Sequence, residues 1–174
     1  MLSVRIDFDM YTSQFVTSKI CLECKGCCKF FGMASSWVPK ATSEDIKKIK
    51  EKGVPLADFL DGKTLKPSYV REAEIFICKF LNFTSSKCTI YDIRPFMCRL
   101  YPFILNHKGK KVFLAADPFC PYIKKKIKSK AFKQHVKQLY ELLSSPQMKT
   151  LIKKNPHIIG EYKEAINLAD LPAK

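Results

Sequence analysis

Four cysteines within eight residues constrain the fold of this chain more than any other feature, in the pattern Cys21-x-x-Cys24-x-x-Cys27-Cys28. At helical spacing, Cys21, Cys24 and Cys28 lie within about 60° of one another, and Cys27 points off that face. In a loop, Gly26 would give the backbone the freedom to wrap around an ion. Tetrahedral zinc or a 4Fe-4S cluster takes four thiolates that surround it. We therefore expect further ligands from distant parts of the chain.

The redox compartment of a protein determines whether clustered cysteines indicate metal binding or disulfide bonds. The chain has 174 residues and 8 cysteines, and a chain of this length buries roughly 70% of its unfolded surface, so its fold does not need cross-links. The first ten residues carry acids where the apolar part of a signal sequence would begin. No apolar run approaches the roughly 18 residues of a membrane span. We expect a cytoplasmic protein with no membrane association, in which clustered cysteines indicate metal or redox chemistry before disulfides.

Eight thiols divide into two sites of four ligands. C-x-x-C-x-x-C followed by a distant Cys-Pro is the ligand order of a 4Fe-4S ferredoxin site, and Cys120-Pro121 is such a pair. This order predicts an iron-sulfur cluster, with 4Fe-4S favoured, on Cys21, Cys24, Cys27 and Cys120. The remaining thiols would form a second metal site or serve as resolving or spare thiols, namely Cys28, Cys78, Cys88 and Cys98. Zinc stays the alternative because four thiolates suit both.

Two arginines and two tyrosines flank Cys98 in the sequence. Guanidinium groups at Arg94 and Arg99 would lower the pKa of a neighbouring thiol and offset the negative charge of metal-bound thiolates. Tyr91 and Tyr101 can donate hydrogen bonds to sulfur or to a carbonyl. The alternative is that Arg94 pairs with Asp92 or caps a helix end, and that the tyrosines fill the core. We expect six phenylalanines to form core that keeps water off the site, namely Phe76, Phe80, Phe96, Phe103, Phe113 and Phe119.

The pattern along the chain predicts an α+β fold, with a small cysteine-rich, metal-stapled core of short strands and a C-terminal group of helices. Alternation predicts a strand at 3–7, and β-branched and aromatic residues predict one at 75–80. A hairpin is expected at 103–115 around a loop at 106–110. Helices are predicted after a cap at Thr42 or Ser43 up to Gly53, at 55–60, at 92–100, from 129 onward, from Pro146 up to Pro156, and at 158–168. We divide the chain into a metal-binding domain, 1–122, and a basic helical extension packed on it, 123–174.

Positive charge is concentrated near the end of the chain. The net charge is +15, and a basic run could bind the phosphates of RNA or DNA. Its members are Lys124, Lys125, Lys126, Lys128, Lys130 and Lys133. We favour a solvated helix face instead, because the sequence has no RNP motif, zinc finger or helix-turn-helix. The three histidines, at 107, 135 and 157, are not paired at the spacing of a two-cysteine, two-histidine finger.

Two segments together resemble a known family. CLECKGCC (21–28) combined with CTIYDIRPFMCRLYPF (88–103), a preceding FICKFL and a following Cys120, resembles the CxxCxxCC family of zinc- or iron-chelating domain proteins, often called YkgJ-like. The similarity covers about residues 18–122. It implies that all eight cysteines belong to a metal-binding pattern, and it implies little about a substrate.

The resulting hypothesis is a cytoplasmic metal-binding protein that carries an iron-sulfur cluster and has a redox or accessory role, with a partner that the sequence does not identify. The alternative is a zinc-stabilised interaction module that binds RNA or DNA through its basic C-terminal helix. No general base or nucleophile constellation accompanies the cysteines, so the sequence leaves open whether the protein is an enzyme.

Overall fold

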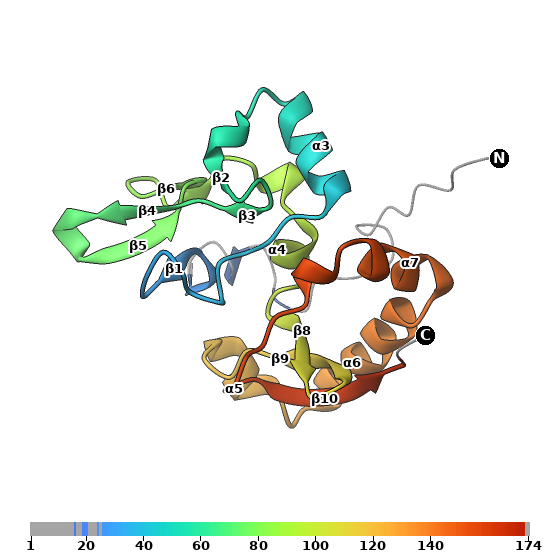
Figure 1. The fold of residues 1–174 in the computed structure, drawn as a ribbon. Helices are drawn as coiled ribbons and strands as arrows, with labels where there is room; N and C mark the ends of the chain where they lie inside the picture. Colours follow the sequence, from blue (N-terminus) through green and yellow to red (C-terminus); the bar gives the residue numbers. More distant parts are fainter. Residues whose placement is uncertain (1–15, 17–18, 21–23, 25, 173–174) are drawn as a thin grey trace.

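The fold is α+β, as predicted, with short antiparallel strands in the first half and most of the helices in the second (Figure 1). The structure is a computed structural model that describes residues 16, 19–20, 24 and 26–172. The strand predicted at 3–7 lies outside these residues.

The first half contains small antiparallel sheets. A three-stranded sheet has the order β1-β5-β4, and two-stranded pairs join β2 with β3 and β6 with β7. The strands are β1 (Lys29–Phe30), β2 (Phe59–Leu60), β3 (Thr64–Leu65), β4 (Pro67–Val70), β5 (Ile75–Cys78), β6 (Leu81–Asn82) and β7 (Lys87–Cys88). Strand β5 confirms the prediction at 75–80. The helix expected at 55–60 is only a 3-10 turn, η2 (Leu56–Asp58), because the chain then enters β2.

Helix α3 (Ser43–Glu51) begins and ends as predicted. The Thr42 side chain accepts a hydrogen bond from the backbone of Asp45, and the Asp45 side chain accepts one from the backbone of Thr42. This reciprocal pair satisfies two backbone N–H groups that a helix start leaves open. Gly53 follows the helix with a φ of 80°, a conformation that favours glycine.

The second half is a three-stranded sheet covered by helices, with the strand order β10-β9-β8. Its elements are β8 (Phe103–Lys108), β9 (Lys111–Ala116), α5 (Pro121–Lys126), α6 (Lys130–Leu143), α7 (Pro146–Lys154), η5 (Pro156–Ile158) and β10 (Ile166–Leu171). The hairpin is confirmed, but its strands extend to Lys108 and from Lys111, so the turn is shorter than the loop expected at 106–110. In α6 an apolar stripe of helical period faces inward, since Phe132, Leu139 and Leu143 are buried.

The helix predicted at 158–168 is wrong. The chain there forms η5, then an irregular stretch, and then β10, which pairs antiparallel with β9 from Ile166 opposite Ala116 to Leu171 opposite Val112. The local sequence is compatible with a helix, but ladder hydrogen bonds to β9 decide the conformation. Strand pairing with a distant segment overrides weak local propensity.

Helix α4 (Phe96–Leu100) links two hydrophobic cores, and confirms the helical turns predicted at 92–100 together with η4 (Tyr91–Ile93). Phe96, Met97 and Leu100 belong to the core that also contains the C-terminal helices. Cys98, on the same helix, packs against the core of the first half, which includes Phe30. A single short helix therefore holds one cysteine against the other half of the molecule.

Candidate metal centre

Four cysteines, which we call the inner cysteine set (Cys28, Cys78, Cys88 and Cys98), line one cavity of about 400 Å³. Cys28 ends η1 (Gly26–Cys28), two others end β5 and β7, and Cys98 lies in α4. The antiparallel pairing of Lys29 with Ile77 places Cys28, just before β1, next to Cys78 at the end of β5. Sheet pairing and one helix thus bring together thiols that lie up to 70 residues apart in the sequence.

The thiols of the inner cysteine set affect one another's ionisation. Burial raises the pKa of Cys78 to about 12, and the charges of Cys28 and Cys88 add to the increase. Burial raises the pKa of Cys98 well above its ordinary value, and the other three thiols raise it further. The thiols of Cys78 and Cys98 are therefore protonated at neutral pH. Several ionised thiolates could lie together in this cavity only if a cation were bound between them.

A second group of cysteines adjoins the first. Cys24, Cys27 and Cys120, which we call the outer cysteine set, line a cavity of about 290 Å³. Cys120 precedes Pro121 at the start of α5, and burial raises its pKa, with smaller contributions from Asp117 and Cys24. Cys21, the fourth predicted ligand of this group, lies outside the described residues. The structure therefore places together the described members of each predicted set.

The two sets touch at Cys27 and Cys28. Their Sγ atoms lie 3.8 Å apart, and Cys27 lines both cavities. As they stand, no three His, Cys, Asp or Glu side chains among the described residues are arranged to hold a metal ion. Metal binding would thus require the cysteine side chains to rotate toward a common point within their cavity.

Tyr91 and Arg94 lie on the wall of the larger cavity, beside the inner cysteine set. The Nε of Arg94 donates a hydrogen bond to the Tyr91 carbonyl at 3.0 Å, and its guanidinium carbon lies 3.7 Å from the centre of the Tyr91 ring. Arg94 opposes the increase in the pKa of Cys98 that burial and the other thiols cause. The Tyr91 hydroxyl is buried, with no hydrogen-bond partner among the described residues. The four thiols are soft donors, and the Arg94 guanidinium and the Tyr91 hydroxyl lie beside them. This combination of groups is suited to a metal bound by thiolates.

Arg99 makes its ion pair with a residue that the sequence interpretation missed. Its Nη2 lies 3.4 Å from Oδ1 of Asp45, which is buried in α3. Asp45 Oδ2 also accepts a hydrogen bond from the backbone N–H of Phe96 at 2.9 Å, at the start of α4. One carboxylate therefore ties α3 to the helix that carries Cys98. The T-x-x-D spacing signals the helix cap but not the contact across 51 residues.

Tyr101 lies between the two cysteine sets and lines both cavities. Its hydroxyl donates a hydrogen bond to Asp117 Oδ2 at 2.7 Å, and Asp117 Oδ1 accepts one from the backbone of Phe119 at 2.8 Å. Burial, and then the Asp117 charge, raise the pKa of Tyr101 far above its ordinary value. This pair connects the end of α4 to the loop that leads to Cys120.

Replacing Tyr101 by phenylalanine should lower the free energy of unfolding by about 1–3 kcal/mol, because the buried Asp117 carboxylate then loses a donor. Urea unfolding of the two proteins measures the difference. Tyr140→Phe is the matched control, since that hydroxyl belongs to a helix away from both cavities, and it should change stability by less than about 0.5 kcal/mol. Equal losses in both variants would contradict the role of the Tyr101–Asp117 pair.

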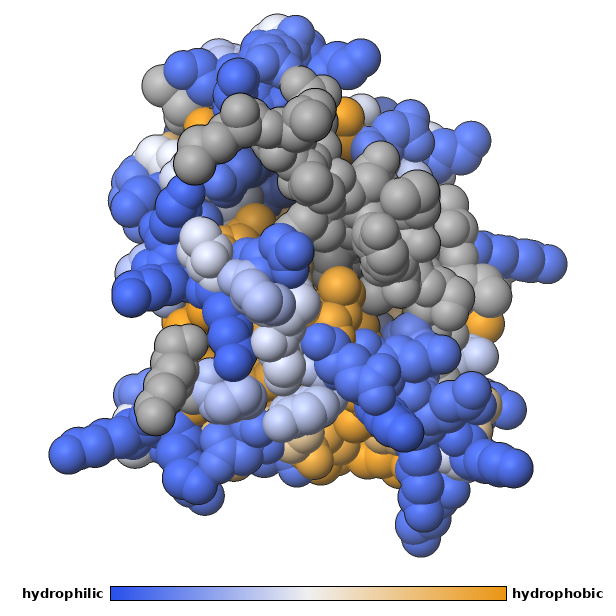
Figure 2. Space-filling model, turned by 90° about the vertical axis from the view of Figure 1, so that its right-hand side faces the viewer, coloured by the Kyte–Doolittle hydropathy of each residue, from blue (hydrophilic) through white to orange (hydrophobic). Residues whose placement is uncertain are grey.

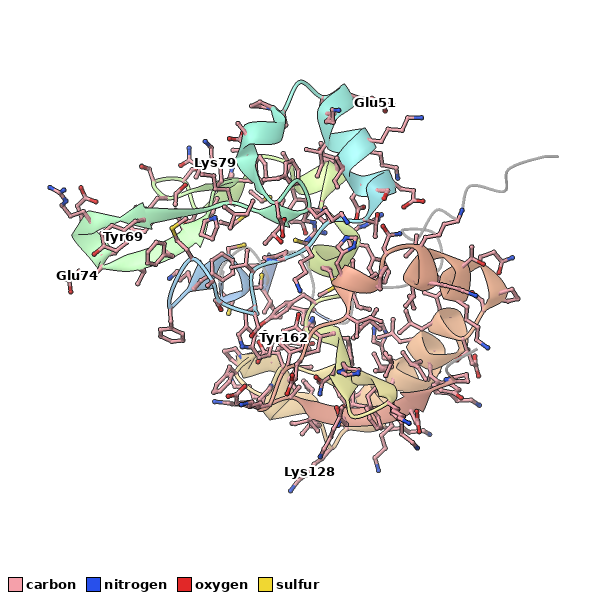
Figure 3. All side chains as sticks on the ribbon, in the orientation of Figure 1. Glu51, Tyr69, Glu74, Lys79, Lys128 and Tyr162 are labelled. Carbon is pink, nitrogen blue, oxygen red and sulfur yellow. The ribbon has the colours of Figure 1, made fainter. Side chains whose placement is uncertain are left out.

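Part of the wall of the larger cavity comes from residues that the sequence interpretation did not single out. Trp37, Asp117 and Tyr162 line this cavity together with the inner cysteine set, and Figure 3 shows Tyr162 where the two halves of the fold meet. Phe119 is 61% exposed, so the expectation that it fills the core is wrong. Phe80, Phe96 and Phe103 are buried as expected. No local pattern marks these wall residues, because they come from three segments far apart in the sequence.

The surface carries the excess positive charge. All six lysines of the basic run are exposed along α5, the start of α6 and the link between them, and Lys128 extends away from the body of the protein (Figure 3). On the face in Figure 2, hydrophilic residues cover much of the described surface, with hydrophobic ones visible between them. Among the described residues, no helix is long and apolar enough to cross a membrane.

The family model described as CxxCxxCC, "Putative zinc- or iron-chelating domain", matches residues 20–121. An uncharacterized protein of Methanocaldococcus jannaschii is 28% identical over 127 residues, which cover 67% of this chain and 61% of that protein. No solved structure matches. The matched range contains all eight cysteines, and it spans more than half of the chain, so this protein belongs to the CxxCxxCC family of zinc- or iron-chelating domains.

Proposed function

We propose that this protein binds an iron-sulfur cluster through cysteine thiolates and has a redox or accessory role in the cytoplasm. The cluster ligands are Cys21, Cys24, Cys27 and Cys120, and the inner cysteine set holds a second metal. The supporting observation is the gathering of seven cysteines around two adjoining cavities. A cluster bound there would supply one-electron redox chemistry.

The surroundings of the thiols favour metal binding over a packing role. Buried cysteines that only fill space do not need neighbours of the same kind. Here Cys28, Cys78 and Cys88 all contribute to the raised pKa of Cys98, so the four lie near one another in an apolar cavity. Arg94 supplies positive charge beside them. This chain's own part would be to position the thiols, exclude water and offset their charge.

Metal and sulfide analysis of protein purified without oxygen tests the proposal. We expect brown protein that contains iron and acid-labile sulfide. Colourless protein with stoichiometric zinc would overturn the iron-sulfur assignment and retain the coarser one, zinc chelation by cysteines. Protein with neither metal would overturn both.

Metal binding should depend steeply on pH, because the thiols of Cys78 and Cys98 are protonated before the metal binds. Burial raises the pKa of Cys78 to about 12 and that of Cys98 well above its ordinary value, so each of these two thiols releases a proton when it binds a metal at neutral pH. Between about pH 6 and 8, the logarithm of the zinc association constant should rise by about one per pH unit for each thiol that is bound. Competition with a chromogenic chelator at several pH values measures this slope. A slope near zero would show that protonated thiols are not the ligands.

A second function is a zinc-stabilised module that binds RNA or DNA through the exposed lysines of α5 and α6. The observation that favours it is the exposure of all six basic-run lysines on adjoining elements. It requires nucleic-acid binding that weakens with salt and with neutralisation of Lys124–Lys133. Absence of binding at low salt would exclude it.

A further inference from the structure

We propose that the larger cavity binds a small aromatic carboxylate, with the ring on its aromatic wall and the carboxylate at Arg94. The cavity has a volume of about 400 Å³, which lies in the range of ligand pockets, roughly 300–1,000 Å³. The proposal depends on the cavity and its charges, and goes beyond metal binding.

Arg94 is the anchor for the anion. Its hydrogen bond to the Tyr91 carbonyl uses only Nε, and the Tyr91 ring supports one face of the guanidinium. Among the described residues, the terminal amino groups of Arg94 have no hydrogen-bond or ion-pair partner, although the side chain is half-buried. Two parallel N–H groups held in a fixed orientation match the two oxygens of a carboxylate.

The other charged groups on the cavity wall favour an anion as well. Asp117 is the acidic residue of this wall, and its two oxygens already accept hydrogen bonds from Tyr101 and from the backbone of Phe119. Lys29 is a second cation, exposed on the same wall. A ligand with one negative charge therefore complements the cavity.

Aromatic side chains line the part of the cavity that would take the ring. Trp37 lies 4.7 Å from Tyr162 and 6.5 Å from Phe119 between ring centres, with the second pair nearly perpendicular at 80°. Gly160 keeps Tyr162 in this position, since a Cβ at Gly160 would collide with the Tyr162 ring. Exposure of Phe119 keeps one aromatic edge accessible to a ligand. Offset or edge-on packing on such a wall favours a flat ring over a branched aliphatic group.

The test compares 3-phenylpropanoate with 3-phenyl-1-propanol, which has the same ring and chain without the charge. Trp37 is the one tryptophan of the chain, so its fluorescence reports binding in the cavity. We expect saturable changes with the acid, and at least about tenfold tighter binding of the acid than of the alcohol, because a charged hydrogen-bond pair is lost in the alcohol. Similar affinities for both probes, or no change with either, would overturn the proposal.

Variants locate the charge contact. Arg94→Gln should weaken binding of the acid at least about tenfold and leave binding of the alcohol unchanged. Arg71→Gln, at an exposed arginine of η3 (Arg71–Ala73), is the matched control and should bind both probes like the unmodified protein. Unchanged binding of the acid to Arg94→Gln would overturn the proposal.

Two further measurements distinguish loss of the carboxylate contact from misfolding and from loss of the metal. Circular dichroism checks the folding of Arg94→Gln, and the acid-alcohol comparison on the unmodified protein needs no variant. Metal content is measured in each sample, so loss of the metal centre and loss of the carboxylate contact are read separately. A metal-free protein that still prefers the acid would overturn the proposed metal centre and retain this inference.

Discussion

Replacing Cys98 by alanine should remove the metal of the inner cysteine set and lower the free energy of unfolding by at least about 3 kcal/mol. Structural metal sites of four thiolates contribute on the order of 10 kcal/mol to folding, and three ligands keep only part of this. The effect should be large here because Cys98 contacts the core of the first half from α4, whose other apolar residues belong to the second core. Metal analysis and urea unfolding of the anaerobically purified variant measure both losses.

Val38→Ala is the matched control for the loss of buried volume. Val38 is buried in the core that Cys98 contacts, and its truncation should cost about 2 kcal/mol from lost apolar burial. This variant should retain the metal content of the unmodified protein. If Cys98→Ala kept all its metal, or lost no more stability than Val38→Ala, the inner cysteine set would not be a metal site.

Replacing Asp45 by alanine should destabilise the fold by about 3–5 kcal/mol, although Asp45 is not a proposed ligand. Its buried carboxylate accepts hydrogen bonds from the backbone N–H groups of Thr42 and Phe96, and pairs with Arg99. Removing Asp45 takes its ion-pair partner from the partly buried Arg99 guanidinium, and the loss of one partner of a buried ion pair is strongly destabilising. The start of α4 then loses its anchor on α3, so the variant should also bind metal more weakly.

Two variants separate the contributions of Asp45. Asp45→Asn keeps an oxygen that can accept a hydrogen bond but loses the charge, and should fall between alanine and the unmodified protein. Glu51→Ala, at the exposed end of α3 (Figure 3), removes a carboxylate from the same helix and should change stability by less than about 0.5 kcal/mol. Urea midpoints at constant m-value measure all three. A loss below about 1 kcal/mol in Asp45→Ala would contradict the anchoring role.

Features with a local physical cause were predictable from the sequence. The stripe of α6 follows from the helical period, and the start of α3 follows from its cap. The grouping of cysteines was predicted from ligand order alone, and the structure brings the described members of each group together. Their role as ligands stays a prediction, as do the domain division at residue 122 and the nucleic-acid contact.

Features that depend on distant pairing were not predictable. The first residues of β10 were expected to be helical. Nothing in their own sequence shows that the neighbouring strand β9 offers backbone groups to which they can hydrogen-bond. Trp37, Tyr162 and Phe119 form one wall only because the β8–β9 sheet packs near the segment that contains Trp37. Asp45 resembled an ordinary first-turn acid of a helix. In each case the decisive partner lies tens of residues away.

Cys27 of the outer cysteine set and Cys28 of the inner cysteine set are neighbours in the sequence, so charges bound at the two sites would interact electrostatically. With sulfurs 3.8 Å apart at Cys27 and Cys28, and metal-sulfur bonds of about 2.3 Å, two bound ions would lie within about 8 Å of each other. At this separation, a unit charge on one centre changes the energy of a unit charge on the other by about 2 kcal/mol at an effective dielectric constant of about 20. Binding of a metal at one centre, or its reduction, would therefore change the metal affinity or the reduction potential of the other centre. Metal binding and reduction at the two centres would then be coupled.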